Sequence, residues 1–243
     1  RIVDRDITVK IELEIKTKIG KNRRKARNVL GEIIGTDKKD EVVMLGAHFD
    51  TWHASPNASD NTSGVAVMLE AMRILKALDI KPRRTIRIAL WSGEEQGLHG
   101  SREYVNKHFG NPNDPNIGVK DGYQKFSAYF NQDYGPGQYR GIYLQDNEHV
   151  RKAFTSWMEP FNDLGMTTIG SQSVGSTDHI PFDRAGLPAF QFLQDRMSIG
   201  LNGRFNFDRR HNVELGYVYY ADSSDYDALR DRDFASIVFS SSF

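Results

Sequence analysis

The stretch EVVMLGAHFD, residues 41–50, decides the fold class of this chain. Its residues 42–47 form a continuous apolar run, and His48 and Asp50 follow directly. Such a run is typical of a central strand that is covered on both faces, as in the parallel sheets of α/β proteins. Polar residues that occur only where such a strand ends predict a functional site at that end.

Helical and strand patterns alternate beyond this run. Residues 61–78 carry apolar side chains at helical spacing, residues 84–91 are a second buried strand, and residues 96–108 are again helical. Further strands are predicted at residues 7–16, 28–35, 126–132, 139–144 and 187–193, and further helices at residues 148–164 and 231–243. This alternation predicts a three-layer α/β/α fold, with a mixed, mostly parallel sheet between helices, in one domain over residues 1–243.

Composition restricts the partners that we expect. The 243 residues include 32 Lys and Arg and 32 Asp and Glu, so the formal net charge is zero, which argues against a nucleic-acid partner. No apolar run approaches 18 residues, so we expect no membrane span. Without cysteine, any metal must bind to histidine and carboxylates. The chain begins at Arg1 without a signal-like segment, so we expect a processed or trimmed part of a longer precursor.

Acidic residues and a histidine stand where the predicted central strands end. They are His48, Asp50, Asp60, Glu94, Glu95 and Asp133. Each alone has an ordinary explanation; Asp60, for example, suits a helix N-cap. Together they predict a shared site, because crowded carboxylates repel one another unless protons or cations neutralise them. Oxygen and imidazole ligands without sulfur suit zinc, manganese or cobalt.

Four motifs, in this order along the chain, carry a family resemblance. They are VVMLGAHFDTWHASPNASDNTSGVAVMLEAMRILK (residues 42–76), RRTIRIALWSGEEQGLHGSREYV (83–105), YFNQDYG (129–135) and GSTDHIPFDRAGLPAFQFLQD (175–195). The chain resembles the co-catalytic zinc exopeptidases of metallopeptidase family twenty-eight, which include bacterial secreted aminopeptidases and carboxypeptidase Q.

The resemblance implies two divalent metal ions, with zinc expected. His48 and Glu95 would each bind one ion, Asp60 would bridge the two, and Asp133 would complete the set of ligands. Glu94 resembles the general base of the family, which takes a proton from the water between the ions and hands it to the leaving amine. Asp50 resembles the acid that orients the metal-binding histidine.

The late part of the chain departs from the family pattern, which has a fifth ligand, a histidine, before a Tyr-Asp pair. Counting back from Tyr226 and Asp227 places Tyr220 at that position, and counting forward from Asp195 places Arg204 near it. We expect His211, the one histidine in this stretch, to supply the ligand. The alternatives are a phenolate from Tyr220 or loss of the second metal site.

The resemblance implies a metal-dependent exopeptidase that acts on a peptide substrate, and we expect an aminopeptidase. One alternative is a dipeptidase similar to carboxypeptidase Q. Another is a non-catalytic peptidase-like binding domain, and a third is an acyltransferase similar to glutaminyl cyclase, which uses one zinc. By analogy with the family we expect a secreted or periplasmic protein. The sequence assigns no oligomeric state.

Overall fold

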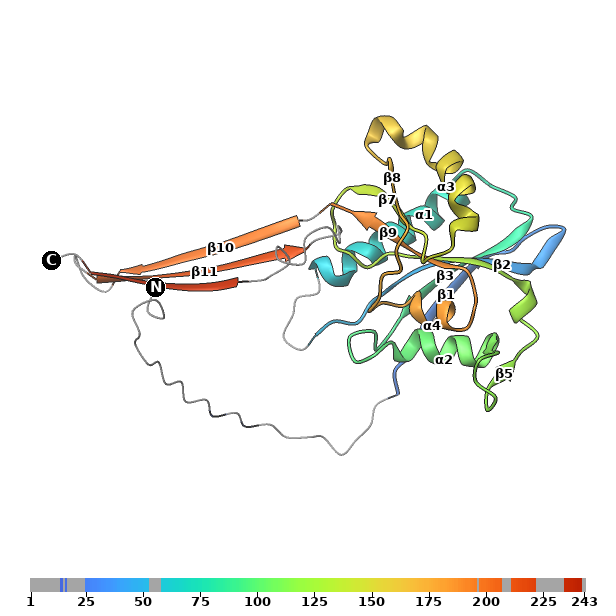
Figure 1. Ribbon diagram of the computed structural model, residues 1–243, viewed down its shortest axis with the longest axis horizontal. Helices are drawn as coiled ribbons and strands as arrows, with labels where there is room; N and C mark the ends of the chain where they lie inside the picture. The colour runs from blue at the N-terminus through green and yellow to red at the C-terminus, as the bar shows by residue number, and fades with distance from the viewer. Residues whose placement is uncertain are drawn as a thin grey trace.

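The computed structural model describes residues 14, 16, 25–52, 58–195, 197–206, 211–221 and 234–241. A seven-stranded sheet with the order β1-β3-β2-β6-β9-β7-β8 lies at the centre of the fold (Figure 1). Its strands are β1 (Val29–Ile33), β2 (Lys38–His48), β3 (Arg84–Trp91), β6 (Phe126–Asn131), β7 (Tyr139–Tyr143), β8 (Thr168–Gly170) and β9 (Ala189–Gln194). Four of the six pairings are parallel, and β1–β3 and β7–β9 are antiparallel. The predicted mixed, mostly parallel sheet is therefore confirmed.

Helices cover both faces of this sheet. Helices α1 (Ser63–Ala77) and α3 (Arg151–Met158) lie on one face, and α2 (His99–His108) and α4 (Ile180–Arg184) lie on the other (Figure 1). Shorter elements complete the body: η2 (Ala58–Thr62), η3 (Tyr123–Lys125), η4 (Glu148–Val150), η5 (Glu159–Leu164), β4 (Gly110–Asn111) and β5 (Gly118–Val119). The central strand β2 is covered on both sides, as its apolar run predicted, because its successive side chains join the clusters under α2 and under α1 in turn.

An aromatic core beneath α2 and α4 holds the central strands in place. Phe182 of α4 is fully buried and stacks on Tyr129, at a ring separation of 4.6 Å, and on Phe126, at 5.4 Å. Trp91, at the end of β3, lies 6.0 Å from both Phe182 and Tyr129. Burying a phenylalanine stabilises a fold by about 1.5–3 kcal/mol. This packing therefore anchors β3 and β6 just below the edge where the predicted site residues emerge.

Two predicted helices differ from the observed ones at their ends. The helix predicted at 148–164 is α3 with a 3₁₀ turn on either side, and Pro160 lies in the turn that follows α3. Proline lacks an amide hydrogen, so it cannot continue the α-helical bonding. The helix predicted from residue 96 begins only at His99, because Leu98 before it has a left-handed backbone with φ of 58°.

The late part of the chain forms a separate three-stranded antiparallel sheet of β10 (Met197–Asn206), β11 (His211–Ala221) and β12 (Phe234–Ser241). In Figure 1 it extends away from the seven-stranded sheet. The helix predicted at residues 231–243 is therefore wrong. The segment is rich in β-branched and aromatic residues, and eight of its residues pair with β11, which favours a strand. The strand predicted at residues 7–16 lies almost wholly outside the described residues.

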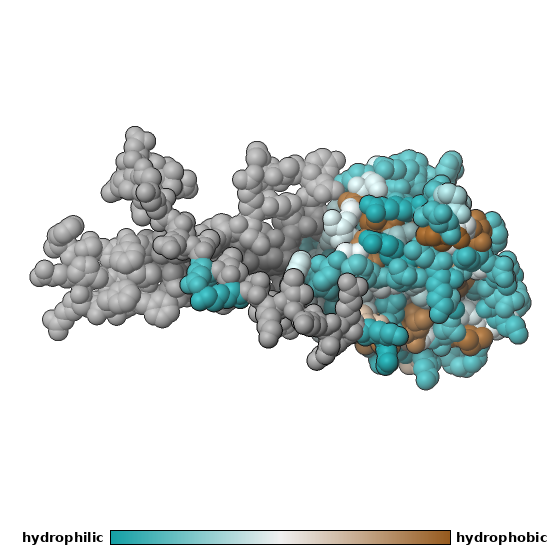
Figure 2. All heavy atoms as spheres, turned by 90° about the horizontal axis from the view of Figure 1, so that it is seen from below, coloured by the Kyte–Doolittle hydropathy of each residue, from teal (hydrophilic) through white to brown (hydrophobic). Residues whose placement is uncertain are grey.

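On the face that Figure 2 presents, the surface of the described residues is mainly polar. Hydrophobic residues there form small separate groups among hydrophilic ones. Across the described part of the chain, no helix has both the length and the apolar character that crossing a membrane requires.

Candidate metal centre

The sheet brings the predicted site residues to one edge. Strand β3 runs parallel to β2, and Trp91 is the register partner of His48. On the other side of β2, Asn131 of β6 is the register partner of Gly46. His48 is the last residue of β2, Glu94 follows β3 by three residues, and Asp133 follows β6 by two. These side chains meet because the carboxyl ends of neighbouring parallel strands lie at the same edge.

The imidazole of His48 is the centre of the site. It is 1% exposed, and its Nε2 atom lies 2.8 Å from Oδ1 of Asp133 and 3.0 Å from Oδ1 of Asp60. Oε2 of Glu94 lies 4.0 Å from the same nitrogen. One buried ring nitrogen therefore faces three carboxylates that come from three separate segments of the chain.

Two sets of possible ligand atoms overlap at His48. Atoms of His48, Asp60 and Glu95 lie within 4.8 Å of one another, and so do atoms of His48, Glu94 and Asp133. We call these five residues the acidic cluster. The structure thus brings together five of the residues that the sequence indicated, and it arranges them as two adjoining groups that share one histidine.

Asp50 connects His48 to the turn that carries the two glutamates. Its carboxylate accepts hydrogen bonds from the backbone amides of Glu94, at 3.1 Å, and Glu95, at 3.3 Å. Nδ1 of His48 lies 3.1 Å from the carbonyl oxygen of Asp50 and 3.5 Å from its carboxylate. Burial opposes ionisation of Asp50, but the hydrogen bonds from His48 and the Glu94 amide outweigh it, and its pKa is lowered. Asp50 therefore stays ionised and holds both parts of the cluster.

Gly93 allows the two adjacent glutamates to occupy different surroundings. Its φ of +71° is a left-handed conformation that glycine adopts readily, and it turns the chain directly after β3. Glu94 is consequently buried, at 8% exposure, whereas Glu95 is only partly buried.

Asp60 reaches the cluster from a kinked segment before α1. Asp60 and Asn61 both depart from helical dihedral angles, and the residue that caps α1 is Thr62. Instead of Asp60, the side chain of Asn61 accepts a hydrogen bond from the Gly64 amide, at 3.1 Å, and donates one to the carbonyl of Gln132, at 2.8 Å. Asn61 thus ties this segment to the residue before Asp133, and the carboxylate of Asp60 is left facing His48.

The electrostatics of the acidic cluster favour a bound cation. Burial and the nearby charge of Asp133 raise the pKa of Glu94 to about 9. Burial also raises the pKa of Asp133, and burial with the charge of Asp60 raises that of Glu95. Burial opposes protonation of His48, but its bonds to Asp133, Asp50 and Asp60 raise its pKa well above the usual value. Within the described residues, no ion pair between a lysine or arginine and these carboxylates is found.

Thr177 is a residue of the site that the sequence reasoning missed. Its buried hydroxyl accepts a hydrogen bond, at 2.8 Å, from Asn131, which lies two residues before Asp133, and Thr177 partly offsets the rise in the pKa of Asp133 that burial causes. The residue lies in the segment GSTDHIPF, directly before the titratable residues Asp178 and His179. A threonine carries no comparable signal in a sequence, and only the fold shows that it is bonded to the end of β6, next to a candidate ligand.

The backbone of His211, the expected fifth ligand, lies at the far end of the three-stranded sheet. His211 is the first residue of β11, and its neighbour Asn212 pairs with Asn206, the last residue of β10. Because β10 leaves the body near β9 and extends about 3.3 Å per residue, His211 begins β11 roughly 30 Å along the sheet from Met197. Tyr220, the alternative, pairs with Ser198 at the near end of β10. Tyr226 and Asp227, from which the count began, lie outside the described residues.

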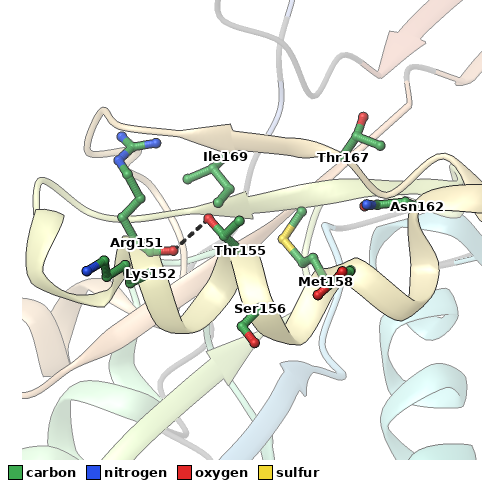
Figure 3. A pocket seen from close by; sticks show the side chains of 9 residues that line it. Arg151, Lys152, Thr155, Ser156, Met158, Asn162, Thr167 and Ile169 are labelled. Atoms are coloured by element: carbon green, nitrogen blue, oxygen red, sulfur yellow. Dashed lines mark hydrogen bonds between the residues drawn. The ribbon is translucent and has the colours of Figure 1, made fainter.

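A depression lies on another part of the molecule, between α3 and the edge strand β8 (Figure 3). Arg151, Lys152, Thr155 and Ile169 are among its lining residues, and it shares none with the acidic cluster. The guanidinium of Arg151 is engaged by Glu148, at 2.6 and 2.8 Å. The chemistry predicted from the sequence therefore belongs to the strand ends and not to this depression.

Known proteins resemble the chain in sequence and in structure. Carboxypeptidase Q from Homo sapiens is 29% identical over 168 residues, a match that covers 69% of this chain and 33% of that protein. Leupeptin-inactivating enzyme 1 from Streptomyces exfoliatus is 29% identical over 163 residues, covering 66% and 34%. Among solved structures, a zinc aminopeptidase from Bacillus subtilis has 27% identity and a TM-score of 0.55, covering 69% of this chain and 40% of that one.

A further solved structure, a peptidase M28 precursor from Shewanella amazonensis, has 28% identity and a TM-score of 0.60 and covers 69% of this chain. The chain spans about a third to two fifths of the length of these relatives. Residues 28–238, most of the chain, match the sequence profile of peptidase family M28, which confirms the resemblance inferred from the four motifs. The chain therefore belongs to peptidase family M28.

Proposed function

We propose that the chain is the catalytic part of a metal-dependent exopeptidase of the aminopeptidase type, which releases the first residue of a peptide. The observation that carries this proposal is the convergence of three carboxylates on Nε2 of the buried His48. Support also comes from a relative that is described as a zinc aminopeptidase.

The donor set fits divalent cations. It contains one imidazole and several carboxylates and no sulfur, which suits zinc, and the ligand atoms lie close enough to share an ion. We assign His48, Asp60, Glu95 and Asp133 as ligands of two zinc ions. When bound, such ions polarise the scissile carbonyl and lower the pKa of the attacking water. We assign no fifth ligand among the described residues, because the backbone of His211 begins at the far end of the three-stranded sheet.

Glu94 is assigned as the general base. It lies in the second group of the acidic cluster, and its buried carboxylate has Oε2 4.0 Å from Nε2 of His48, next to the assigned ligands. Its Oε2 would take a proton from the attacking water and deliver it to the nitrogen of the leaving group. Asp50 positions this base, because its carboxylate accepts a hydrogen bond from the backbone amide of Glu94. The same carboxylate also orients His48.

The proposal treats residues 1–243 as one metallopeptidase domain. Its support is that the family match runs from residue 28 to residue 238, across the seven-stranded and the three-stranded sheets. We also propose export, to the periplasm or out of the cell, by analogy with the family.

The test is hydrolysis of aminoacyl anilides, free dipeptides and N-blocked peptides by the purified chain, before and after a chelator. We expect the free-amine anilides to be hydrolysed, activity to be lost with the chelator, and zinc to restore it. Glu94→Gln should lower turnover by about 10²- to 10⁴-fold and leave the zinc content unchanged. Glu103→Gln, on the exposed side of α2, is the matched control.

Other outcomes select the alternatives. Hydrolysis of dipeptides alone would identify a dipeptidase similar to carboxypeptidase Q. Cyclisation of an N-terminal glutamine would identify an acyltransferase. Bound zinc without any turnover would identify a non-catalytic binding domain and overturn the proposal.

A further inference from the structure

The loop that carries the candidate ligand Asp133 crosses over the end of a neighbouring strand. In the seven-stranded sheet β9 lies between β6 and β7, so residues 132–138, which connect β6 to β7, must pass the carboxyl end of β9. The last residue of β9 is Gln194, and Tyr139 begins β7 beside it as its register partner. Gln132 and Gln194 are at most 1% exposed, so the side-chain amides that meet this loop are shielded from water.

Two buried glutamine side chains hold the carbonyl groups of this loop. Nε2 of Gln132 donates to the carbonyl oxygen of Gly135, at 3.0 Å, and Nε2 of Gln194 donates to the same oxygen, at 2.8 Å. Gln194 also donates to the carbonyl oxygen of Gly137, at 3.0 Å. A carbonyl oxygen has two acceptor positions, so both positions of Gly135 are filled by side chains. We call Gln132 and Gln194 the glutamine clamp.

The orientation of both amides follows from the groups that they meet. A carbonyl oxygen can only accept, so each glutamine must turn its nitrogen, and not its oxygen, towards the loop. Oε1 of Gln132 then faces the hydroxyl of Tyr139, which donates to it at 2.8 Å. A flipped amide would set two oxygens against each other at Gly135. The clamp is therefore directional, and it supports one arrangement of the loop.

The backbone of Gln132 joins the clamp to the other segments of the acidic cluster. Its amide donates to the carbonyl oxygen of Gly46, at 3.0 Å, on the strand that ends in the candidate histidine. Its carbonyl oxygen accepts from Nδ2 of Asn61, at 2.8 Å, the residue after Asp60. Gln132 itself directly precedes Asp133. One residue therefore joins the three segments that bear the imidazole and the two carboxylates closest to it.

We propose that Gln132 and Gln194 are positioning residues for the metal site. By binding the loop carbonyls together, they hold the arrangement in which the carboxylate of Asp133 lies 2.8 Å from Nε2 of His48. This inference rests on the proposed function, because it assumes that Asp133 binds zinc. Neither glutamine belongs to the acidic cluster. Groups outside the ligand set that orient a ligand change metal affinity by about 10- to 100-fold when they are lost.

The experiment measures the zinc affinity of the full chain by competition with a chromophoric chelator. Gln132→Met keeps the length of the side chain and removes both of its hydrogen-bonding groups. We expect zinc to bind about 10- to 100-fold more weakly. The visible spectrum of the cobalt-substituted protein should also change, because it reports the geometry of the ligands around the ion.

Gln145→Met is the matched control. Gln145 is also buried, and its amide bonds to Val174 and His179, outside the loop. The control should lose stability in urea denaturation, as Gln132→Met does, and keep the zinc affinity and the cobalt spectrum of the unaltered chain. A merely structural role of the clamp would make the two variants alike in all three measurements.

Two more variants test the other bonds of the clamp. Gln194→Met should weaken zinc binding in the same range, since it removes the bonds to Gly135 and Gly137. Tyr139→Phe removes a single oxygen and should weaken binding by about 2- to 10-fold. In a Gln132→Met background it should have no further effect, because its hydroxyl bonds to Gln132. Should Gln132→Met fail to fold, these two variants carry the test.

Two results would overturn the inference while leaving the proposed function intact. One is a zinc affinity equal to that of Gln145→Met in any of the three variants Gln132→Met, Gln194→Met and Tyr139→Phe. The other is an undiminished effect of Tyr139→Phe in the Gln132→Met background. If instead the unaltered chain bound no zinc, the proposed function would fail and the inference with it.

Discussion

Removing the charge of Glu94 should stabilise the metal-free protein. Its carboxyl is buried beside Asp133, and its pKa of about 9 lies far above the ordinary value of 4.5. At neutral pH the folded chain therefore holds a proton there that the unfolded chain has released. The glutamine of Glu94→Gln has nearly the same shape and cannot ionise. Folding of the variant therefore requires neither uptake of a proton nor burial of a charge at this position.

The size of the effect follows from linkage between protonation and folding. A carboxyl whose pKa is raised on folding contributes stability that is complete below 4.5 and is lost as pH rises towards 9. Each pH unit in this window changes the free energy of unfolding by about 1.4 kcal/mol. The variant should thus match the unaltered chain near pH 4.5 and exceed its stability by about 3 kcal/mol at pH 7.

Urea denaturation in the presence of a chelator, at several pH values between 5 and 8, measures this difference. Glu103→Gln removes the same charge from an exposed position on α2 and should change stability little at any pH. The reasoning is refuted if the difference between the unaltered chain and Glu94→Gln does not grow with pH. With zinc bound, the gap should shrink, because the cations neutralise the buried carboxylate.

Three further predictions concern the core, the cluster and a buried histidine. Phe182→Ala should lower the free energy of unfolding by about 3–5 kcal/mol, measured by urea denaturation, since Phe182 is fully buried among aromatic rings; a loss under about 1 kcal/mol would contradict this packing. Asp60→Ala should abolish zinc binding in elemental analysis, and full zinc content would exclude Asp60 as a shared ligand. Burial lowers the pKa of His179 to about 4, so stability should fall as pH drops from 6.5 towards 4. In thermal melts of the metal-free chain, His179→Gln should lose less stability than the unaltered chain between these two pH values. An equal loss in both proteins would show that another group causes it.

Much of the central fold could be predicted from local patterns. The apolar run at residues 42–47 predicted β2, and the helical spacing after residue 61 predicted α1, which spans Ser63–Ala77. Such patterns are reliable because burial on two faces, or on one helical face, constrains every residue of the element. The same reading failed at residues 231–243, where β-branched and aromatic residues form β12 by pairing with β11. That pairing joins distant segments, and no local pattern contains it.

The chemistry of the candidate site was also visible in part. His48, Asp60, Glu94, Glu95 and Asp133 stood out because each follows a predicted strand or opens a predicted helix, and the structure brings them together. Thr177 did not stand out, because it is linked to the site by a hydrogen bond from Asn131, which lies 46 positions earlier in the chain.

The amino-acid sequence by itself determined the kind of donors available for a cation and their order along the chain, since both depend only on residue identity and on strand-forming patterns. Tertiary structure alone decided which of these groups meet, which glutamate is buried, and in which direction the hydrogen bonds around them run. Those properties depend on distances between segments that are far apart in the chain, and the packing of the parallel strands sets these distances.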